Sequence, residues 1–468
     1  MTQQELTTCH CIISHPSKPK FLVIKHTDRW SPPLLKFPVE GSIVLKVRMI
    51  NYGMMNKYGL KTTVLRRLAR GKNYYCIELE MQSQKNLKNM KAVWVGSKEY
   101  AQYRSSKPGD IDPFELWLKQ KESGKIPVQR PPWERRAWFN NAEFWILQQL
   151  DRLNIQVTGS VQQLRAFRTA SCILHVSTSE GKIFFKASNT RPPQEAALTQ
   201  AIARKWPGLI QEPLAIETRK NWMLMRNYFG PEHSRIKFED YPAIAGMLAV
   251  FQLESLESMD SWKKLGCPVQ GQDHLASFLQ ELDQITPILG EGGGIALNEE
   301  EIEQLKLTGQ DLQISCRELS EFSIPLTLVH PDVWYPNLTA KSGEFQILDW
   351  MGTIISHPFF SVLKLIRFRE LWTGAQPSLP AEKADDRELK NSILEAYLGP
   401  FTRFENEHRL QAAMAMVGKL ETAWRLFKWS KEIDSNEPES LSYQDLARGL
   451  QKIARQVIGR KTANVSTP

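Results

Sequence analysis

The feature that most constrains this chain is a polar loop, His330–Asn337, that lies between two short apolar runs. The runs cover residues 326–329 and 345–348, and the second ends at Asp349. Two prolines exclude a helix interior within the loop, and a glycine before the second run marks a turn. The pattern therefore predicts a strand, a tight loop and a returning strand that brings Asp349 beside Asn337.

The polar residues of this segment form the pattern H-x-D-x-x-x-x-N, followed by the second Asp, which suits phosphoryl transfer from a nucleotide. That reaction needs a base for a hydroxyl proton, and an amide and a second carboxylate for magnesium. Asp332 fits the base, and Asn337 and Asp349 fit the metal ligands, because Mg²⁺ usually takes one or two protein carboxylates beside phosphate oxygens and water. Asp and Asn are also ordinary loop residues, so the loop alone leaves a structural role open.

An upstream segment supports the same interpretation. Residues 170–178 and 182–187 predict two strands of a hairpin around a Glu-Gly turn, with Lys186 near the end of the second strand. A helical pattern follows and begins near Glu195. In nucleotide-dependent kinases a strand lysine contacts the α- and β-phosphates and is held by a glutamate of the next helix. The alternative for Lys186 is a solvated lysine on a strand.

The loop resembles the catalytic loop of the aminoglycoside phosphotransferase and choline kinase family, whose usual form is H-G-D-x-x-x-x-N, then an apolar strand and D-W or D-x. Ser356–Phe360 is similar to the segment that follows the metal-binding Asp in many bacterial members. The chain departs from the family at Pro331, where glycine is usual, and at Trp334-Tyr335, where His-Pro is common. These departures put the substrate in doubt more than the chemistry.

The resemblance implies an α+β fold, a two-lobed protein-kinase-like fold, that uses ATP and Mg²⁺ to phosphorylate a hydroxyl of a small polar metabolite or antibiotic. It makes Asp332 the base, with His330 bracing the loop, and Asn337 and Asp349 the magnesium ligands. The remaining candidates, for nucleotide binding, are Lys186 clamped by Glu195, Ser171 in a turn, and Met225 and Asn227 at the hinge between lobes. Ser171 also fits a plain turn, and the hinge residues also fit a buried strand and turn.

The first 125 residues predict a separate α/β domain. A strand at 21–24, a W-x-P-P turn, a helix at 46–58 closed by Gly59, and further strands resemble a Nudix hydrolase. That family's helix binds magnesium through R-E-x-x-E-E-x-G. Alignment on Gly59 puts Tyr52, Gly53, Asn56 and Lys57 at those positions, and no Asp or Glu occurs between residues 42 and 58. We therefore expect a Nudix-like domain without hydrolase activity.

The remaining organisation follows from breaks and helical patterns. A proline-rich linker at 126–140 leads to an N-lobe at 141–230 and a C-lobe at 231–460. Helices are expected at 144–151, 241–255, 410–429 and 443–457, and after the cap Asn298, with a flexible glycine-rich joint at 290–294. Apolar residues of the C-terminal helices fit the core, with the wall of a substrate pocket as the alternative: Met414, Leu420, Trp424 and Phe427.

Composition sets weaker bounds. The net charge of +9 over 468 residues, with a pI of about 9.1, favours anionic ligands. We expect no nucleic-acid partner, because the nearest basic cluster (Arg66, Arg67, Arg70, Lys72) fits a solvated face. We expect no secretory signal and no membrane span, and six dispersed cysteines fit a reduced, cytoplasmic chain without zinc at Cys9-His10-Cys11. The oligomeric state stays open.

Two other functions stay open. The chain could be a non-catalytic nucleotide-binding or scaffold protein with a kinase-like fold, although the complete set of polar residues argues against lost turnover. A protein kinase is disfavoured, because no D-F-G or A-P-E follows the loop. The sequence does not choose the acceptor or distinguish ATP from GTP.

Overall fold

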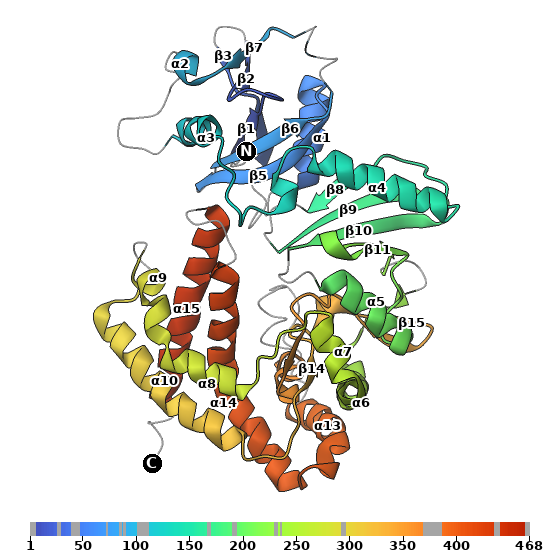
Figure 1. Ribbon diagram of the computed structural model, residues 1–468, viewed down its shortest axis with the longest axis vertical. Coiled ribbons are helices and arrows are strands. Elements are labelled where there is room, and N and C mark those ends of the chain that lie inside the picture. The colour runs from blue at the N-terminus through green and yellow to red at the C-terminus, as the bar shows by residue number, and fades with distance from the viewer. Residues whose placement is uncertain are drawn as a thin grey trace, which may run out of the picture. The chain divides into compact units, whose positions relative to one another are not determined.

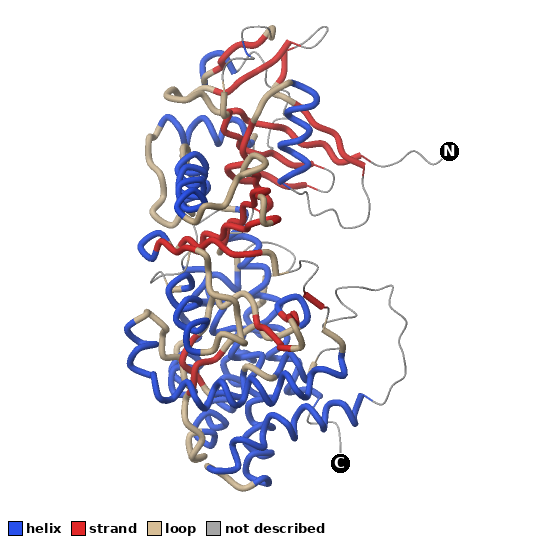
Figure 2. The backbone as a smooth tube through the Cα atoms, turned by 90° about the vertical axis from the view of Figure 1, so that its right-hand side faces the viewer, coloured by secondary structure: helices blue, strands red, loops and turns tan. Residues whose placement is uncertain are grey.

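The computed structural model describes residues 6–463 except 26–29, 39–46, 72–73, 84–86, 88–89, 101–111, 166–169, 190–193, 229–232, 235, 292–295, 368–385 and 435–439. The turn before Ser171 and part of the glycine-rich joint therefore lie outside the described residues. The chain divides into two compact units: residues 1–189 with 435–444, and residues 190–434 with 445–468. Strands are prominent in the first unit and helices in the second (Figure 2).

The first unit contains three described sheets. A mixed sheet has the order β4-β1-β6-β5, in which β1 and β6 are parallel and the other neighbours antiparallel. A small sheet has the order β3-β2-β7, and β8, β9 and β10 form an antiparallel group. The strands are β1 Leu6–Ile13, β2 Phe21–Lys25, β3 Trp30–Ser31, β4 Leu34–Pro38, β5 Thr62–Gly71, β6 Tyr74–Met81, β7 Ala92–Val95, β8 Gln162–Arg165, β9 Ser171–Thr178 and β10 Gly181–Ser188.

The helices of this unit are α1 Val47–Tyr58, α2 Ser97–Tyr100, α3 Pro113–Glu122 and α4 Trp138–Arg152. The predicted hairpin is confirmed: β9 pairs with β10 in antiparallel register, and Gly181 takes a φ of 93° at the turn. The helix predicted at 46–58 is confirmed within one residue by α1. Gly59, which follows the helix, has a φ of 65°. Left-handed backbone of this kind favours glycine because it has no Cβ.

One prediction for the basic cluster is wrong. Arg66 does not lie on a solvated face but is buried at 7% exposure, where its Nε contacts Glu78 Oε2 at 2.7 Å. The pairing of β5 with β6 shifts register between Val64 and Arg66, so the alternation of faces changes at this point. Glu78 also contacts Lys121 of α3 at 2.9 Å, which ties the helix to the sheet.

The segment predicted as a linker, 126–140, lies within the first unit and is packed there. Trp133 is buried, and the backbone N–H of Ala137 donates to both carboxylate oxygens of Glu80 at 3.0 and 3.1 Å. The side chain of Gln163 on β8 accepts from the Val64 N–H at 2.7 Å and donates to the Val64 carbonyl at 2.9 Å. The buried Gln163 amide thus forms hydrogen bonds with both backbone polar groups of Val64, and these bonds fix β8 against β5. Figure 1 shows α4 along β8–β10 in this unit.

All six cysteines are buried, and none forms a disulfide. Cys9 and Cys11 lie on β1 and Cys76 on the neighbouring β6. Burial raises the pKa of the Cys172 thiol, so that thiol is protonated at neutral pH. In the part of the chain that the structure describes, no helix combines the length and apolarity needed to cross a bilayer.

The second unit is mainly helical. Its helices are α5 Glu195–Lys205, α6 Tyr241–Ser255, α7 Met259–Lys264, α8 Gln272–Gln280, α9 Thr286–Gly290, α10 Glu299–Leu319, α11 Leu363–Ile366, α13 Asp386–Leu398, α14 Glu407–Asp434 and α15 Leu441–Ala463, the last of which begins in the first unit. Its strands are β11 Ala215–Glu217, β12 Trp222–Arg226, β13 His233–Ser234, β14 Thr327–Val329, β15 Leu338–Lys341, β16 Glu344–Ile347 and β17 Ile354–Ser356.

The helices that the sequence predicts in this unit are confirmed. The prediction of 241–255 coincides with α6, and α10 begins after Asn298, whose side chain accepts from the Glu301 N–H in a capping box. The predictions of 410–429 and 443–457 lie inside the longer α14 and α15.

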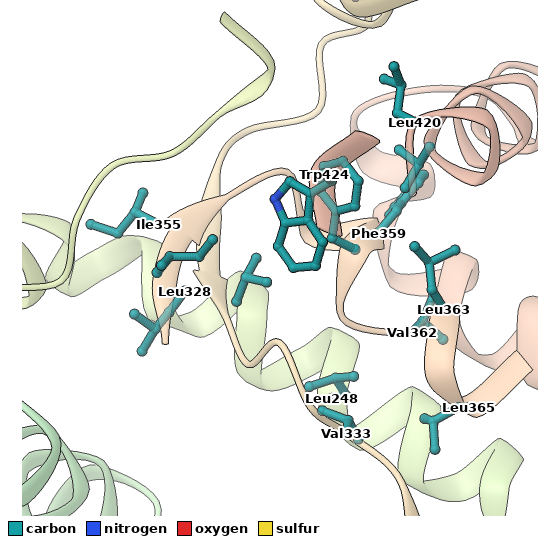
Figure 3. Packing of buried hydrophobic residues seen from close by; sticks show 14 of the residues in the cluster. Leu248, Leu328, Val333, Ile355, Phe359, Val362, Leu363, Leu365, Leu420 and Trp424 are labelled. Carbon is teal, nitrogen blue, oxygen red and sulfur yellow. The ribbon is translucent and has the colours of Figure 1, made fainter. Parts of the chain in front are cut away.

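One apolar core fills this unit and reaches the polar loop. Figure 3 shows Leu328, just before the loop, and Val333, within it, in one cluster with Leu248 of α6, Phe359, and Trp424 of α14. The Trp424 ring stacks on Phe360 at 4.5 Å with an interplanar angle of 9°. Met414, Leu420, Trp424 and Phe427 are all buried, as the prediction of core residues requires. The loop therefore rests on a packed base rather than on solvent-exposed chain.

Candidate active site

The polar loop is held between two pairs of strands. β14 leads into it and pairs with β17, and the loop ends in a short 3₁₀ turn, Tyr335–Asn337, that runs into β15. β15 pairs antiparallel with β16, with Leu338 opposite Ile347. The predicted strands on either side of the loop are present as β14 and β16, but they do not pair with each other. β16 pairs with β15, a strand that the sequence analysis did not predict, and this pairing places the end of β16 beside the start of β15.

Asp332 and Asn337 are in direct contact. Asn337 Nδ2 donates to the backbone oxygen and to Oδ2 of Asp332, both at 2.9 Å. Because both of these partners are acceptors, they fix the orientation of the amide and leave Asn337 Oδ1 on the other side of the group. This contact of Asn337 closes the loop and fixes the Oδ2 atom of Asp332. The Asp332 side chain remains 38% exposed to solvent.

His330 links this loop to the segment before Asp349. Its Nδ1 accepts from the Asp332 N–H at 3.1 Å, so its Nε2 carries the proton and donates to the Leu348 carbonyl at 3.1 Å. The ring is fully buried and packs edge-on against Trp350 at 4.9 Å. Burial lowers the pKa of His330 to about 4, against the opposing effect of the two nearby carboxylates. The neutral imidazole of His330 uses both ring nitrogens in hydrogen bonds to the backbone. It therefore supports the loop and has no free nitrogen for proton transfer.

Asp349 follows the returning strand in a strained backbone conformation. The Leu348 N–H donates to the Asn337 carbonyl at 2.8 Å, which places the residue before Asp349 directly against Asn337. Asp349 has a φ of 64°, and a non-glycine residue in that region costs on the order of 1 kcal/mol or more. Strain of this kind concentrates at functional sites, because surrounding contacts must hold the residue in place.

A lysine that the sequence analysis did not single out contacts the expected base. Lys364 Nζ of α11 forms a short ion pair with Asp332 Oδ1, the oxygen that Asn337 does not contact. The same ammonium lies 5.6 Å from the centre of the Trp334 ring. The Lys364 ammonium thus lies between the Asp332 carboxylate and the face of an aromatic ring, both of which favour its positive charge.

Buried hydrogen bonds fix the segment that carries Lys364. Gln252 Nε2 of α6 donates to the Pro358 carbonyl and to Ser361 Oγ, both at 3.1 Å. Tyr397 Oη contacts the same carbonyl at 2.8 Å and Gln252 Oε1 at 2.6 Å. The leucines on either side of Lys364 are buried in the core, at positions 363 and 365. The sequence signal that could have identified Lys364 is a single lysine within the apolar run Val362-Leu363-Lys364-Leu365-Ile366.

A second lysine lies near this ion pair. Lys428 of α14 places its Nζ 4.9 Å from the centre of the Trp424 ring. Burial lowers the pKa of Lys428 to about 8. The charge of Glu432, one turn further along α14, opposes this shift most, and the charges of Lys364 and Asp332 also act on it. Its spacing of four residues from the buried Trp424 was the only sequence signal, and it is shared with many helical lysines.

The predicted nucleotide-binding residues are divided between the two units. In the first unit, Lys186 and Ser171 are buried, on β10 and at the start of β9. In the second unit, Glu195 is fully buried in the first turn of α5. The N–H of the next residue, Ala196, donates to the Asn221 side chain. Met225 lies near the end of β12, and Asn227 follows it; both are partly buried.

The donor set of the loop suits magnesium better than a softer metal. Among the described residues, no group of three or more His, Cys, Asp or Glu side chains could hold a metal by itself. One amide oxygen and one carboxylate, from Asn337 and Asp349, would leave most positions for phosphate oxygens and water, as Mg²⁺ prefers. The residues present therefore fit the ion that the loop pattern implies.

Comparison with known proteins gives structural likenesses at low identity. No family model matches the chain, and no curated protein matches its sequence. A choline kinase from Streptococcus pneumoniae matches at 11% identity with a TM-score of 0.43, over 68% of this chain and 99% of that one. An ethanolamine kinase from Plasmodium vivax matches at 10% identity with a TM-score of 0.45, over 77% and 99%.

A macrolide 2′-phosphotransferase of type I matches at 11% identity with a TM-score of 0.44, over 68% of this chain and 97% of that one. The similar solved structures thus include antibiotic phosphotransferases and choline or ethanolamine kinases. Since identity and TM-score are both low, the functional argument rests on the residues of this chain.

Proposed function

We propose that the chain is a small-molecule kinase that transfers the γ-phosphoryl group of ATP to a hydroxyl of a small polar metabolite or antibiotic. The observation that carries this proposal is the contact of Asn337 with the Asp332 carboxylate. The hydrogen bond from the Leu348 N–H to the Asn337 carbonyl holds the end of β16 beside Asn337. Asp349, the second carboxylate, is the next residue after Leu348. A base, an amide and a carboxylate in this order are the parts that the reaction requires.

Asp332 is the base in this mechanism. The acceptor hydroxyl gives its proton to the Asp332 carboxylate as its oxygen bonds to the γ-phosphorus. The bond from that phosphorus to the β–γ bridging oxygen breaks, and ADP leaves. His330 holds the loop and takes no proton, because both of its nitrogens are already bonded. Magnesium, held by Asn337 and Asp349, would neutralise the phosphate charge.

The remaining assignments extend the proposal to a two-lobed kinase-like fold. Lys186, supported by Glu195, would contact the phosphates, with Ser171 beside them. Met225 and Asn227 would lie at the adenine-binding hinge. The N-terminal domain would be a Nudix-like shell without hydrolase activity, since the described helix α1 has no Asp or Glu.

The test is transfer of label from γ-labelled ATP to a panel of hydroxyl-bearing metabolites and antibiotics, with magnesium. We expect a labelled, phosphorylated product from at least one acceptor class and slow ATP hydrolysis without an acceptor. A chain that binds no ATP, or that binds it without transfer to any acceptor or to water, would be the non-catalytic protein instead.

The role of Asp349 gives a separate prediction. Asp349→Asn removes the charge that holds the metal, so we expect magnesium-dependent ATP binding to weaken by about 10- to 100-fold. The measurement is calorimetric titration with ATP at saturating and zero magnesium. The control is Asp260→Asn on α7, an aspartate with 89% of its side chain exposed. Equal affinity of wild type and Asp349→Asn for Mg-ATP would contradict the assignment.

A further inference from the structure

The two oxygens of the Asp332 carboxylate contact different groups. Oδ2 accepts from the amide of Asn337, on the side where the metal is proposed to bind. Oδ1 contacts the ammonium of Lys364, which comes from the helical side of the site. An acceptor hydroxyl that reaches Oδ1 must therefore displace Lys364 or share the oxygen with it. A displaced, partly buried ammonium needs another anion.

Lys428 gives an independent reason to expect an anion on this side. Its ammonium forms no ion pair with any residue in the described part of the chain, although it is partly buried beside Trp424. The loss of water lowers its pKa to about 8, so it remains mostly protonated at neutral pH. The carboxylate of Asp332, whose charge acts on it, is already in contact with Lys364 and Asn337.

Other charged groups on this side are internally balanced. Arg367 Nη1, one turn after Lys364, contacts Glu421 Oε1 of α14 at 2.5 Å. Glu432, one turn after Lys428, is exposed to solvent, and its charge favours the protonated form of that lysine. Two cations, Lys364 and Lys428, thus lie near Asp332, a carboxylate that the reaction itself needs, and the one other carboxylate that acts on Lys428 is Glu432 at the exposed surface.

We infer that the acceptor carries an anionic group, a carboxylate or a phosphate, which Lys364 and Lys428 bind while its hydroxyl reaches Asp332. This inference rests on the proposed function and names its substrate class: anionic hydroxy metabolites rather than cationic amino alcohols or amino sugars. An acceptor with a positive charge would have to enter beside two ammonium groups, and like charges in a partly desolvated site repel strongly.

The first experiment compares acceptors of different charge with the wild-type protein. A metabolite extract is separated on ion-exchange resins into anionic, neutral and cationic fractions, and each is incubated with γ-labelled ATP and magnesium. Glycerate, glycerol 3-phosphate, glycerol and choline serve as defined probes. We expect label transfer to the anionic fraction, and the first two probes distinguish a carboxylate from a phosphate.

Transfer to the neutral or cationic fraction alone would overturn the inference and leave the proposed function intact. Absence of transfer to all fractions, with no ATP hydrolysis, would overturn both. The two failures are therefore distinguishable in one assay.

The second experiment compares lysines of the same helix. Lys428→Met removes the cation and keeps the length of the side chain, whereas Lys431→Met removes an exposed lysine one turn away. We expect Lys428→Met to raise KM for the anionic acceptor by about 10- to 100-fold, the usual effect of one lost charge-assisted hydrogen bond, with little change in KM for Mg-ATP. Lys431→Met should change either KM by less than about twofold.

Lys364→Gln should also raise KM for the anionic acceptor. Its effect on kcat separates acceptor binding from a role in the chemical step. If both Lys364→Gln and Lys428→Met leave the acceptor KM unchanged, or raise KM for Mg-ATP instead, the lysines do not bind the acceptor and the inference fails. Thermal unfolding of each variant checks that the fold is retained.

Discussion

Replacing Asp332 with alanine is expected to lower kcat by about 10²- to 10⁴-fold, the usual contribution of a general base. Affinity for Mg-ATP should stay within about threefold of the wild-type value, because Asp332 is assigned to the acceptor hydroxyl and not to the nucleotide. The measurement is steady-state kinetics with the acceptor found in the panel, together with calorimetric titration of the nucleotide.

The structure indicates that the loop survives this change. Asn337 Nδ2 keeps its bond to the backbone oxygen at position 332, and the N–H at that position still donates to His330 Nδ1. Asp332→Asn is the more conservative variant, since its amide has the shape of the carboxylate but cannot take a proton. Both variants should lose turnover to a similar degree. Turnover within about threefold of wild type in either variant would exclude Asp332 as the base.

The sequence predicted the local geometry of this loop but not its surroundings. The spacing of Asp332, Asn337 and Asp349 indicated a strand, a loop and a returning strand, because prolines, a glycine and two apolar runs restrict short segments strongly. The contact with Lys364 joins residues that are 32 positions apart. Such a contact depends on how the core orients α11, and no local pattern encodes that.

The same limit applies in the first unit. A proline-rich composition at 126–140 predicted a linker, and prolines and polar residues do favour irregular backbone there. Whether such backbone is solvated or packed depends on partners distant in sequence, here Glu80 and its two bonds to the Ala137 N–H. The burial of Arg66 is hidden from a local pattern for the same reason, since its partner Glu78 lies on the next strand.

The ion pair of Arg66 with Glu78 leads to the second large effect. Glu78→Ala is expected to destabilise the first unit by about 3–5 kcal/mol, because Arg66 would remain buried without its counterion. The measurement is urea unfolding followed by hydrogen exchange of the β5 and β6 amides, which reports on this unit alone. Glu115→Ala removes a glutamate from the exposed pair with Lys119 and should cost less than about 0.5 kcal/mol.

A double variant separates the lost pair from a general loss of packing. Arg66→Met with Glu78→Leu replaces both charges with apolar groups of similar volume, and most of the stability should return, since a buried pair gains little over a well-packed apolar contact. Lys121, the other partner of Glu78, is 26% exposed and can turn to solvent. Equal destabilisation by the single and double variants would show that the charges are not the cause.

The pH dependence of stability gives the same pair a second test. Burial alone would raise the pKa of Glu78, but the charges and hydrogen bonds of Arg66 and Lys121 outweigh it and lower the pKa to about 2. A carboxyl whose folded pKa is lowered stabilises the protein fully above its ordinary value of 4.5, and this stability is lost as pH falls from there towards 2. The loss amounts to about 3 kcal/mol. Glu78→Gln cannot titrate, so its unfolding free energy should fall less steeply over this range, and parallel profiles for the variant and the wild type would contradict a role for the pair in acid stability.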